Sequence, residues 1–280
     1  MSKPRLTVAS CVSNTEAFEA CVLESISFLR EDLDISIIPV YNEMNLYSAS
    51  IAANLAMEIT KDRFLLYVHQ DVMFKQKASE TIARLIKNWS DGLAVVGSAG
   101  VRESVHPELL GKWGLESIEN VNVGSVYDQN DELIWDGCDG FHAVHSVDEV
   151  LMLIDRSSGL RFDPSWRGYH FYGLDFCLQA RSTGYRVAVD SIEIKHCGQY
   201  SSSIYKDAGF LKKLIQLHEK WSTRFSQMCA PYCHWDNNRI VSYVPFGVKD
   251  VCRKRIDVPR LSVTVSDRQS WNDFAKGQQN

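Results

Sequence analysis

The stretch Phe64-Leu65-Leu66-Tyr67-Val68-His69-Gln70-Asp71 decides the fold. In it an apolar run, residues 64–68, is followed directly by three polar residues, 69–71. Five apolar or aromatic residues in a row predict a buried strand. Further apolar runs that predict strands lie at residues 6–12, 34–41 and 93–96. Stretches with helical character separate them, at residues 18–29, 47–59 and 78–89. This β-α-β-α-β-α-β order predicts an α/β fold with an open, mainly parallel sheet and helices on both of its faces.

The second half of the chain is less regular. Strand character returns at residues 143–155, 186–189 and 192–196, and helical character at 172–182 and 211–225. Residues 101–141 are rich in Gly, Asn, Asp and Trp and are predicted to be mostly loops. Beyond residue 226 the pattern is irregular. We therefore predict one domain over residues 1–225 and a C-terminal extension over 226–280 that packs on the domain or extends it.

The composition narrows the possible classes of protein. The 280 residues include 30 Lys and Arg against 35 Asp and Glu, which gives a net charge of -5. This mild acidity argues against nucleic acid as a partner, because phosphate backbones select basic surfaces. No apolar run approaches the ~20 residues of a membrane-spanning helix, so no transmembrane segment is predicted. The eight cysteines form no Cys-x-x-Cys pair, and the N-terminus does not resemble a secretory signal. We therefore expect reduced thiols in a cytoplasmic protein.

Polar residues follow three of the predicted strands, as Ser13-Asn14, Tyr41-Asn42-Glu43 and His69-Gln70-Asp71. Ligands of open α/β sheets bind beyond the carboxyl ends of the strands, so these residues are candidates for a site. A carboxylate such as Asp71 in that position is well placed to hold Mg²⁺ or Mn²⁺, which take oxygen ligands. It could equally cap the next turn or form an ion pair with Lys75 or Lys77.

Two residues farther along the chain invite two interpretations each. Asp175 falls in the first turn of a predicted helix, where an acidic residue is favourable by ~0.3–1 kcal/mol without any function. A carboxylate there could also act as a general base. His196 follows a short strand and becomes a site residue only if it faces Asp71; otherwise it is a structural or exposed histidine.

Taken in order, these pieces resemble nucleotide-sugar glycosyltransferases with the GT-A fold, of the family 2 type and its streptomycin-biosynthesis branch. The resemblance covers roughly residues 6–225. It is carried by Val12-Ser13-Asn14, Ser50-Ile51-Ala52-Ala53-Asn54, His69-Gln70-Asp71-Val72, Val147-Asp148-Glu149-Val150, the block 162–187 and His196. The block 162–187, which includes Tyr172-Gly173-Leu174-Asp175, is the most specific part.

The resemblance implies a role for each matching position. Asp71 corresponds to the last carboxylate of the family's DxD motif, which holds a divalent metal, and His196 to a late histidine that completes the metal's ligands. His69 stands where the family has the first Asp, which is a departure. Asp175 matches the carboxylate that serves as general base. Positions that match nucleotide-sugar binding are Ser13, Asn14, Tyr41, Glu43, Ser50, Asn54, His69, Gln70, Asp148 and Glu149.

These roles imply an inverting transferase that uses Mn²⁺ or Mg²⁺. A base-activated hydroxyl that displaces the diphosphate in line inverts the anomeric configuration. The implied donor is a nucleotide-diphosphate sugar, with a UDP-sugar as first choice. The implied acceptor is a hydroxyl group of a saccharide, a lipid-linked molecule, a protein or a small molecule.

Two other functions compete with this one. A nucleotidyltransferase would have a Gly-rich, basic loop after the first strand, but Ser13-Asn14-Thr15-Glu16 contains neither Gly nor Lys. The sequence also lacks the GxGxxG and GxxxxGK[ST] fingerprints of other nucleotide sites. The second alternative is a non-catalytic nucleotide-sugar-binding protein on a degenerate transferase fold, which the His69 departure favours.

Overall fold

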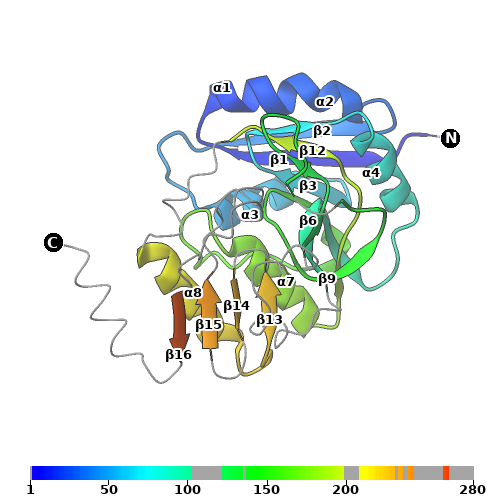
Figure 1. Cartoon of the computed structure of the whole chain (residues 1–280). Coiled ribbons are helices and arrows are strands. Elements are labelled where there is room, and N and C mark those ends of the chain that lie inside the picture. Colours follow the sequence, from blue (N-terminus) through cyan, green and yellow to red (C-terminus); the bar gives the residue numbers. More distant parts are fainter. Residues whose placement is uncertain are drawn as a thin grey trace.

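A computed structural model of the chain describes residues 2–102, 122–134, 137–198, 208–230, 233–235, 239–242 and 261–264. Within these residues the centre of the molecule is a nine-stranded sheet of order β2-β1-β3-β10-β5-β11-β9-β6-β7 (Figure 1). Its strands are β1 (Arg5–Val12), β2 (Asp34–Tyr41), β3 (Phe64–Val68), β5 (Leu93–Gly97), β6 (Ala99–Arg102), β7 (Asn122–Gly124), β9 (His142–Val147), β10 (Leu151–Asp155) and β11 (Arg186–Val189).

Six of the nine strands run in the same direction, which confirms the predicted α/β class with a mainly parallel sheet, although five of the eight neighbouring strand pairs are antiparallel. Strand β1 pairs in parallel with β2 and β3, and β5 pairs in parallel with β11. Strand β10 lies between β3 and β5 and runs antiparallel to both. The structure divides the apolar stretch 143–155 into β9 and β10, which are separated in the sheet by β5 and β11. A turn that begins at Asp148 separates the two strands. The side chain of Asp148 accepts a hydrogen bond from the backbone N–H of Val150 (3.0 Å).

Two apolar cores lie on the two faces of this sheet, because side chains alternate along each strand. In β3, Leu65 and Tyr67 point to one face and Leu66 and Val68 to the other. The first face is covered by α3 (Ala49–Ile59), α7 (Tyr172–Ser182) and α8 (Ala208–Trp221). The second face is covered by α4 (Ala78–Lys87) and by a continuous helix, α1 (Thr15–Phe18), the π-helical turn η1 (Glu19–Leu23) and α2 (Glu24–Leu29). Figure 1 shows α1 and α2 above the strands and α7 and α8 below them.

Two smaller sheets complete the described fold. The first has the order β4-β12-β8 and comprises β4 (Val72–Phe74), β12 (Ile194–His196) and β8 (Val126–Tyr127). The second is antiparallel and comprises β13 (Met228–Ala230), β14 (Cys233–Trp235), β15 (Arg239–Ser242) and β16 (Leu261–Thr264). Met228 and Trp235 are buried in the same core as α7 and α8. Residues just beyond 225 therefore pack on the α/β core, while the division into residues 1–225 and 226–280 stays a prediction.

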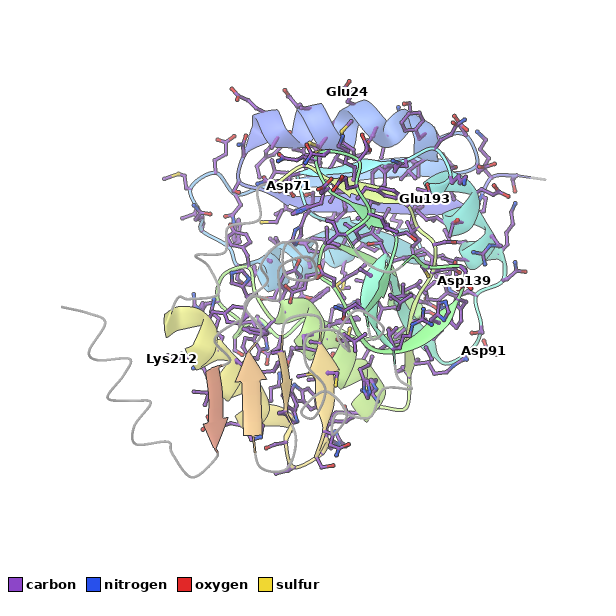
Figure 2. All side chains as sticks on the ribbon, viewed as in Figure 1. Glu24, Asp71, Asp91, Asp139, Glu193 and Lys212 are labelled. Atoms are coloured by element: carbon purple, nitrogen blue, oxygen red, sulfur yellow. The ribbon has the colours of Figure 1, made fainter. Side chains whose placement is uncertain are left out.

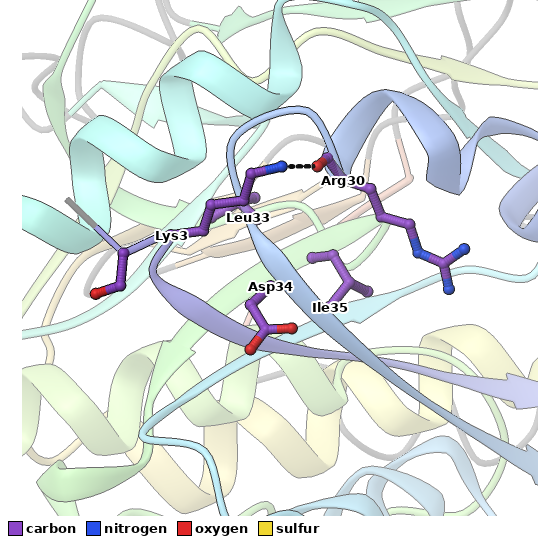
Figure 3. A pocket seen from close by; sticks show the side chains of 6 residues that line it. Lys3, Arg30, Leu33, Asp34 and Ile35 are labelled. Carbon is purple, nitrogen blue, oxygen red and sulfur yellow. Dashed lines mark hydrogen bonds between the residues drawn. The ribbon is translucent and has the colours of Figure 1, made fainter.

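The two ends of the sheet differ. The carboxyl ends of β1, β2 and β3 lead into the polar residues singled out above. At the opposite end, where β1 and β2 begin, there is a pocket lined by Ser2, Lys3, Arg30, Leu33, Asp34 and Ile35 (Figure 3). The Lys3 ammonium donates a hydrogen bond across it to the backbone carbonyl of Arg30 (2.6 Å). This pocket is remote from the candidate site because parallel strands begin and end at opposite edges.

Candidate functional site

Three side chains that the sequence places far apart meet beyond the carboxyl end of β3. They are His69, Asp71 and His196, and one potential ligand atom of each lies within 4.8 Å of those of the other two. His196 Nε2 lies 3.3 Å from Asp71 Oδ1. All three side chains are partly buried, and Figure 2 shows Asp71 just below the α1–α2 helix. Within the described residues this is the one cluster of His, Cys, Asp and Glu with the spacing of a metal site.

Backbone pairing brings these three residues together. In the small sheet, β12 runs antiparallel to β4, so that His196 lies opposite Val72. The N–H of Cys197 donates to the carbonyl of Asp71 (2.8 Å). The N–H of His69 donates to the carbonyl of Val150 (3.0 Å), which ties the end of β3 to the start of β10. Main-chain hydrogen bonds therefore bring the backbones of the three residues together.

The electrostatics leave His69 and Asp71 in the forms that bind metals. Burial disfavours the imidazolium of His69 and lowers its pKa to about 4, so the ring is neutral at pH 7. Burial alone would raise the pKa of Asp71, but the hydrogen bond and charge of His196 outweigh it, and this pKa is lowered. A neutral imidazole and an ionised carboxylate are the ligand forms that a metal requires.

The lysines considered as partners of Asp71 bind elsewhere. Lys75 lies 3.1 Å from Asp131, and Lys77 lies 3.7 Å from Glu193. Gly198 instead packs against the carboxylate, since a Cβ at this position would overlap Asp71 Oδ2. The interpretation of Asp71 as a lysine partner is therefore wrong, and the space beside its carboxylate is kept by the absence of a side chain at residue 198.

Gln70 connects the ends of β3 and β1. Its Oε1 accepts hydrogen bonds from the backbone N–H groups of Ser13 and Asn14 (2.8 Å each), and its Nε2 donates to Ser13 Oγ (3.1 Å). Asn14 in turn caps helix α1 by accepting from the N–H of Ala17 (3.1 Å). Ser13, Asn14 and Gln70 are thus next to one another and adjoin the cluster of His69, Asp71 and His196.

The end of β2 carries an exposed loop held by a buried residue. Tyr41 is 58% exposed, and Glu43 accepts a hydrogen bond from the hydroxyl of Thr15 (2.7 Å). Asn42 is buried and binds both the N–H and the carbonyl of Tyr47 (2.9 and 2.8 Å). It also donates to the hydroxyl of Tyr169 (3.0 Å), so residues just before α7 adjoin the ends of β1 and β2. The sequence marked Asn42 as a candidate by its place directly after a strand, but its contact with Tyr169, 127 residues away, was not predicted.

Ser50 and Asn54 contact the segment that leads into α7. Ser50 Oγ donates to the carbonyl of Trp166 (3.0 Å). The amide of Asn54 bonds both the carbonyl and the N–H of Phe162 (2.8 and 3.0 Å). Both residues of α3 therefore hold the backbone of the segment that leads into α7, and Ser50 also contacts the hydroxyl of Ser48 (2.9 Å).

Asp148 and Glu149 occupy the break between β9 and β10. Glu149 is buried and accepts a hydrogen bond from the N–H of Gly173 (3.1 Å) in the first turn of α7. Phe171, which precedes this helix, has a positive φ of 66° and gives no side-chain cap, so Glu149 supplies the cap from a distant part of the chain. Burial raises the pKa of Glu149 to about 8. Burial also raises the pKa of Asp148, and the charge of His196 opposes this increase.

Asp175 lies one turn into α7 and is engaged by α8. Its side chain is 1% exposed. The Lys220 ammonium lies 2.8 Å from Oδ1, and the indole N–H of Trp221 donates to the same oxygen (2.7 Å). Lys220 also binds Asp163 (2.6 Å). Burial raises the pKa of Asp175, while the hydrogen bonds of Lys220 and Trp221 act against the increase.

Helix α7 links Asp175 to the three-residue cluster. Tyr172, three residues before Asp175, has its hydroxyl 3.3 Å from His69 Nε2. The structure thus brings together His69, Asp71 and His196, places Ser13, Asn14 and Gln70 beside them, and connects Asp175 to them through the first turn of α7. Lys220 and Trp221 were not predicted as its partners, because their positions in the sequence carry no sign of a contact with residue 175.

The described helices include none that is both long and apolar enough to cross a membrane. No curated protein was found to match the sequence. Among solved structures, a mannosyltransferase from Pyrobaculum calidifontis in complex with GDP-mannose and Mn²⁺ is similar, with a TM-score of 0.47 and 12% identity over 82% of this chain and 67% of that one. A mutant of Drosophila β-1,4-galactosyltransferase 7 in complex with manganese, UDP-galactose and xylobiose gives a TM-score of 0.44 and 9% identity over 70% and 71%. Staphylococcus aureus TarS in complex with UDP-GlcNAc gives 0.45 and 10% over 78% and 66%.

The family comparison concerns the sequence itself. The profile of a family described as glycosyltransferase-like matches residues 7–218. This range includes the central sheet except for the first two residues of β1, and it includes the three-residue cluster and Asp175. Since the match spans well over half of the chain, the protein belongs to this glycosyltransferase-like family.

Proposed function

We propose that the protein is an inverting, metal-dependent glycosyltransferase that takes its sugar from a nucleotide diphosphate. The observation that carries the proposal is the convergence of His69, Asp71 and His196 at the carboxyl edge of the sheet. In open α/β folds this edge is where ligands bind. The family match gives the reaction class, and the cluster gives a place for a metal beside a diphosphate.

The residues around the cluster suggest how the donor would be held. Ser13 and Asn14 adjoin the cluster through Gln70, and Tyr41 and Glu43 extend the same edge. We propose that the nucleoside lies against these four residues, with the exposed ring of Tyr41 available to stack on a base. Ser50, Asn54 and Glu149 would act less directly, since they fix the segment before α7 and its first turn. The nucleotide is proposed to be a uridine diphosphate.

The ligand set fits a divalent metal. Asp71 supplies an ionised carboxylate and His196 an imidazole, and the Cβ-free Gly198 leaves room at the carboxylate. When bound, Mn²⁺ or Mg²⁺ would neutralise the negative charge that develops on the departing diphosphate. Without such a cation the acidic side chains at this edge would repel the donor's phosphates.

Asp175 is the proposed general base. Its raised pKa suits a carboxylate that accepts a hydroxyl proton. Because its carboxylate is buried against Lys220 and Trp221, an acceptor hydroxyl reaches it only if α8 moves or if the hydroxyl replaces one of these contacts. The proposal therefore includes a rearrangement of α8 relative to α7 when the acceptor binds.

The same burial favours one alternative. A carboxylate that is 1% exposed and paired with a lysine is also what a purely structural ion pair would provide. In that case the protein would bind nucleotide sugars and not transfer them.

The two functions are separated by assaying the full chain with UDP-, GDP- and dTDP-sugars and Mn²⁺, and measuring donor binding, donor hydrolysis and transfer. We expect the wild type to turn over the donor and Asp175→Asn to lower this turnover by at least about 100-fold. The control variant Asp91→Asn, at an exposed carboxylate (Figure 2), should leave the turnover unchanged. Proton NMR of the product should show the opposite anomeric configuration to the donor. Donor binding without turnover, together with an Asp175→Asn variant that behaves like the wild type, would support the binding protein. A location in the cytoplasm is expected as well and is tested by cell fractionation.

A further inference from the structure

The three clustered side chains offer two imidazole rings and one carboxylate, and this set is unlike the all-oxygen sites that Mg²⁺ prefers. We infer that His69 is itself a ligand of the metal, so that His69, Asp71 and His196 form a two-histidine, one-carboxylate site that selects a first-row transition ion over Mg²⁺. The inference rests on the proposed function in one respect, because it takes the same cluster as the place of the metal.

The distances are those of a site that closes with small side-chain movements. Two ligands bound to one ion at ~2.0–2.2 Å lie about 3–3.6 Å apart. Asp71 and His196 already have this separation, at 3.3 Å. The ring centroids of His69 and His196 are 6.1 Å apart with planes inclined by 55°. The two rings are therefore inclined to each other and not stacked, and one ligand atom of each ring and one carboxylate oxygen of Asp71 all lie within 4.8 Å of one another.

His69 is held in this position by two independent contacts. Its N–H is bound to the carbonyl of Val150 (3.0 Å), which fixes its backbone. The hydroxyl of Tyr172 lies 3.3 Å from Nε2. Tyr172 is buried with its ring edge-on to Tyr67 (86° between planes), so this hydroxyl has a fixed place. A second partner that orients the imidazole is what histidine ligands of metals generally have.

The choice of ion follows from the donor chemistry. Mg²⁺ is a hard cation that binds carboxylates, phosphates and water, and it gains little from a neutral imidazole. Nitrogen ligands favour the first-row transition ions, with affinity rising from Mn²⁺ through Co²⁺ and Ni²⁺. A carboxylate at position 69 would add an oxygen and a negative charge. With His69 the site loses both, so the attraction for Mg²⁺ falls while that for Co²⁺ or Mn²⁺ is kept.

The test is a titration of the full chain, freed of metal by chelation, with Co²⁺ as the probe and no nucleotide sugar present. Co²⁺ reports its nitrogen and oxygen ligands through visible absorption, and its dissociation constant is measured alone and in competition with Mg²⁺. We expect His69→Ala to weaken Co²⁺ binding at least about 10-fold and to change the spectrum. His142→Ala is the matched control, since His142 binds Asp139 (2.8 Å) and lies outside the cluster.

A second variant, His69→Asp, keeps a ligand at this position and guards against a simple loss of folding, which circular dichroism monitors. We expect it to bind Mg²⁺ more tightly than the wild type and to reduce the preference for Co²⁺ over Mg²⁺ by at least about 10-fold. The inference is wrong if the wild type does not bind Co²⁺, if His69→Ala binds it within twofold of the wild type, or if His69→Asp leaves the preference unchanged. The titration contains neither donor nor acceptor, so its result is independent of the transfer assay. If the wild type binds Co²⁺ as expected but shows no transfer in that assay, the proposed function is refuted and this inference stands.

Discussion

The contact between Lys220 and Asp175 gives the sharpest test of how the two helices α7 and α8 depend on each other. Lys220→Met removes the ammonium that lies 2.8 Å from Asp175 and 2.6 Å from Asp163 and keeps most of the aliphatic stem. The carboxylate of Asp175 then stays buried, 1% exposed, with the indole N–H of Trp221 as its remaining neighbour at 2.7 Å. A buried charge without its counter-charge is strongly unfavourable.

The size of the effect follows from burial. Removing one partner of a fully buried ion pair costs about 3–5 kcal/mol. The Lys220 side chain is 34% exposed, and solvent screens part of its charge, so we expect a loss of about 2–3 kcal/mol. At about 2–4 °C per kcal/mol for a domain of this size, Tm should fall by roughly 5–10 °C at pH 7.

The loss should depend on pH with a definite sign. The pKa of Asp175 is already raised by burial, and removing Lys220 takes away a cause that lowers it. For an acid whose pKa is higher in the folded protein, stability falls as pH rises above the pKa of the unfolded chain, because the unfolded chain releases the proton first. The difference in Tm between the variant and the wild type should therefore be small near pH 4.5 and widen towards pH 7.

Thermal unfolding followed by circular dichroism measures this difference. The double variant Lys220→Met with Asp175→Asn removes both charges and should recover at least half of the lost Tm, which a double-mutant cycle quantifies. Lys212→Met on the same helix is the control, because Lys212 is exposed (Figure 2) and should shift stability by less than about 0.5 kcal/mol. A Lys220→Met variant that unfolds within 1 °C of the wild type at pH 7, or no recovery in the double variant, would refute the reasoning.

Three more predictions concern the site and its supports. Gly198→Ala should abolish metal binding measured by calorimetry, because the added Cβ would overlap Asp71 Oδ2. Gly137→Ala, whose Cβ would make only an ordinary contact with Leu133, should keep metal binding, and equal affinities of the two variants would contradict this. Asn54→Ala should lower the free energy of unfolding in urea by about 2–3 kcal/mol, because it leaves two buried backbone groups of Phe162 without partners; a loss no larger than that of exposed Asn88→Ala would count against it. Glu149→Gln should gain Tm relative to the wild type as pH rises from 4.5 to about 8, because the raised pKa of Glu149 makes the wild type lose stability over that interval; parallel Tm profiles would disprove the pH assignment.

Much of the fold was predictable because its elements are local. The apolar run that ends at Val68 is strand β3 with the predicted bounds, and the helix predicted over 172–182 is α7. Such segments are set by the spacing of apolar residues and by hydrogen bonds within a few residues of the chain. The end of a strand also identified the region of Asp71, since a polar residue that follows a buried strand emerges at the edge of a sheet.

Tertiary structure alone decided which of these residues meet. The antiparallel insertion of β10 between β3 and β5 has no local signal, since strand order depends on the packing of the whole chain. The contact of Asp71 with His196, the cap that Glu149 gives to α7 and the pairing of Asp175 with Lys220 join positions 125, 24 and 45 residues apart. The sequence predicted Asp175 as a general base. In the fold its carboxylate is paired with Lys220 and is almost completely buried. The sequence by itself determined the elements and the edge where the site lies. The protonation states, the supports and the neighbours of each site residue came from long-range packing, because burial and charge are properties of the folded surroundings.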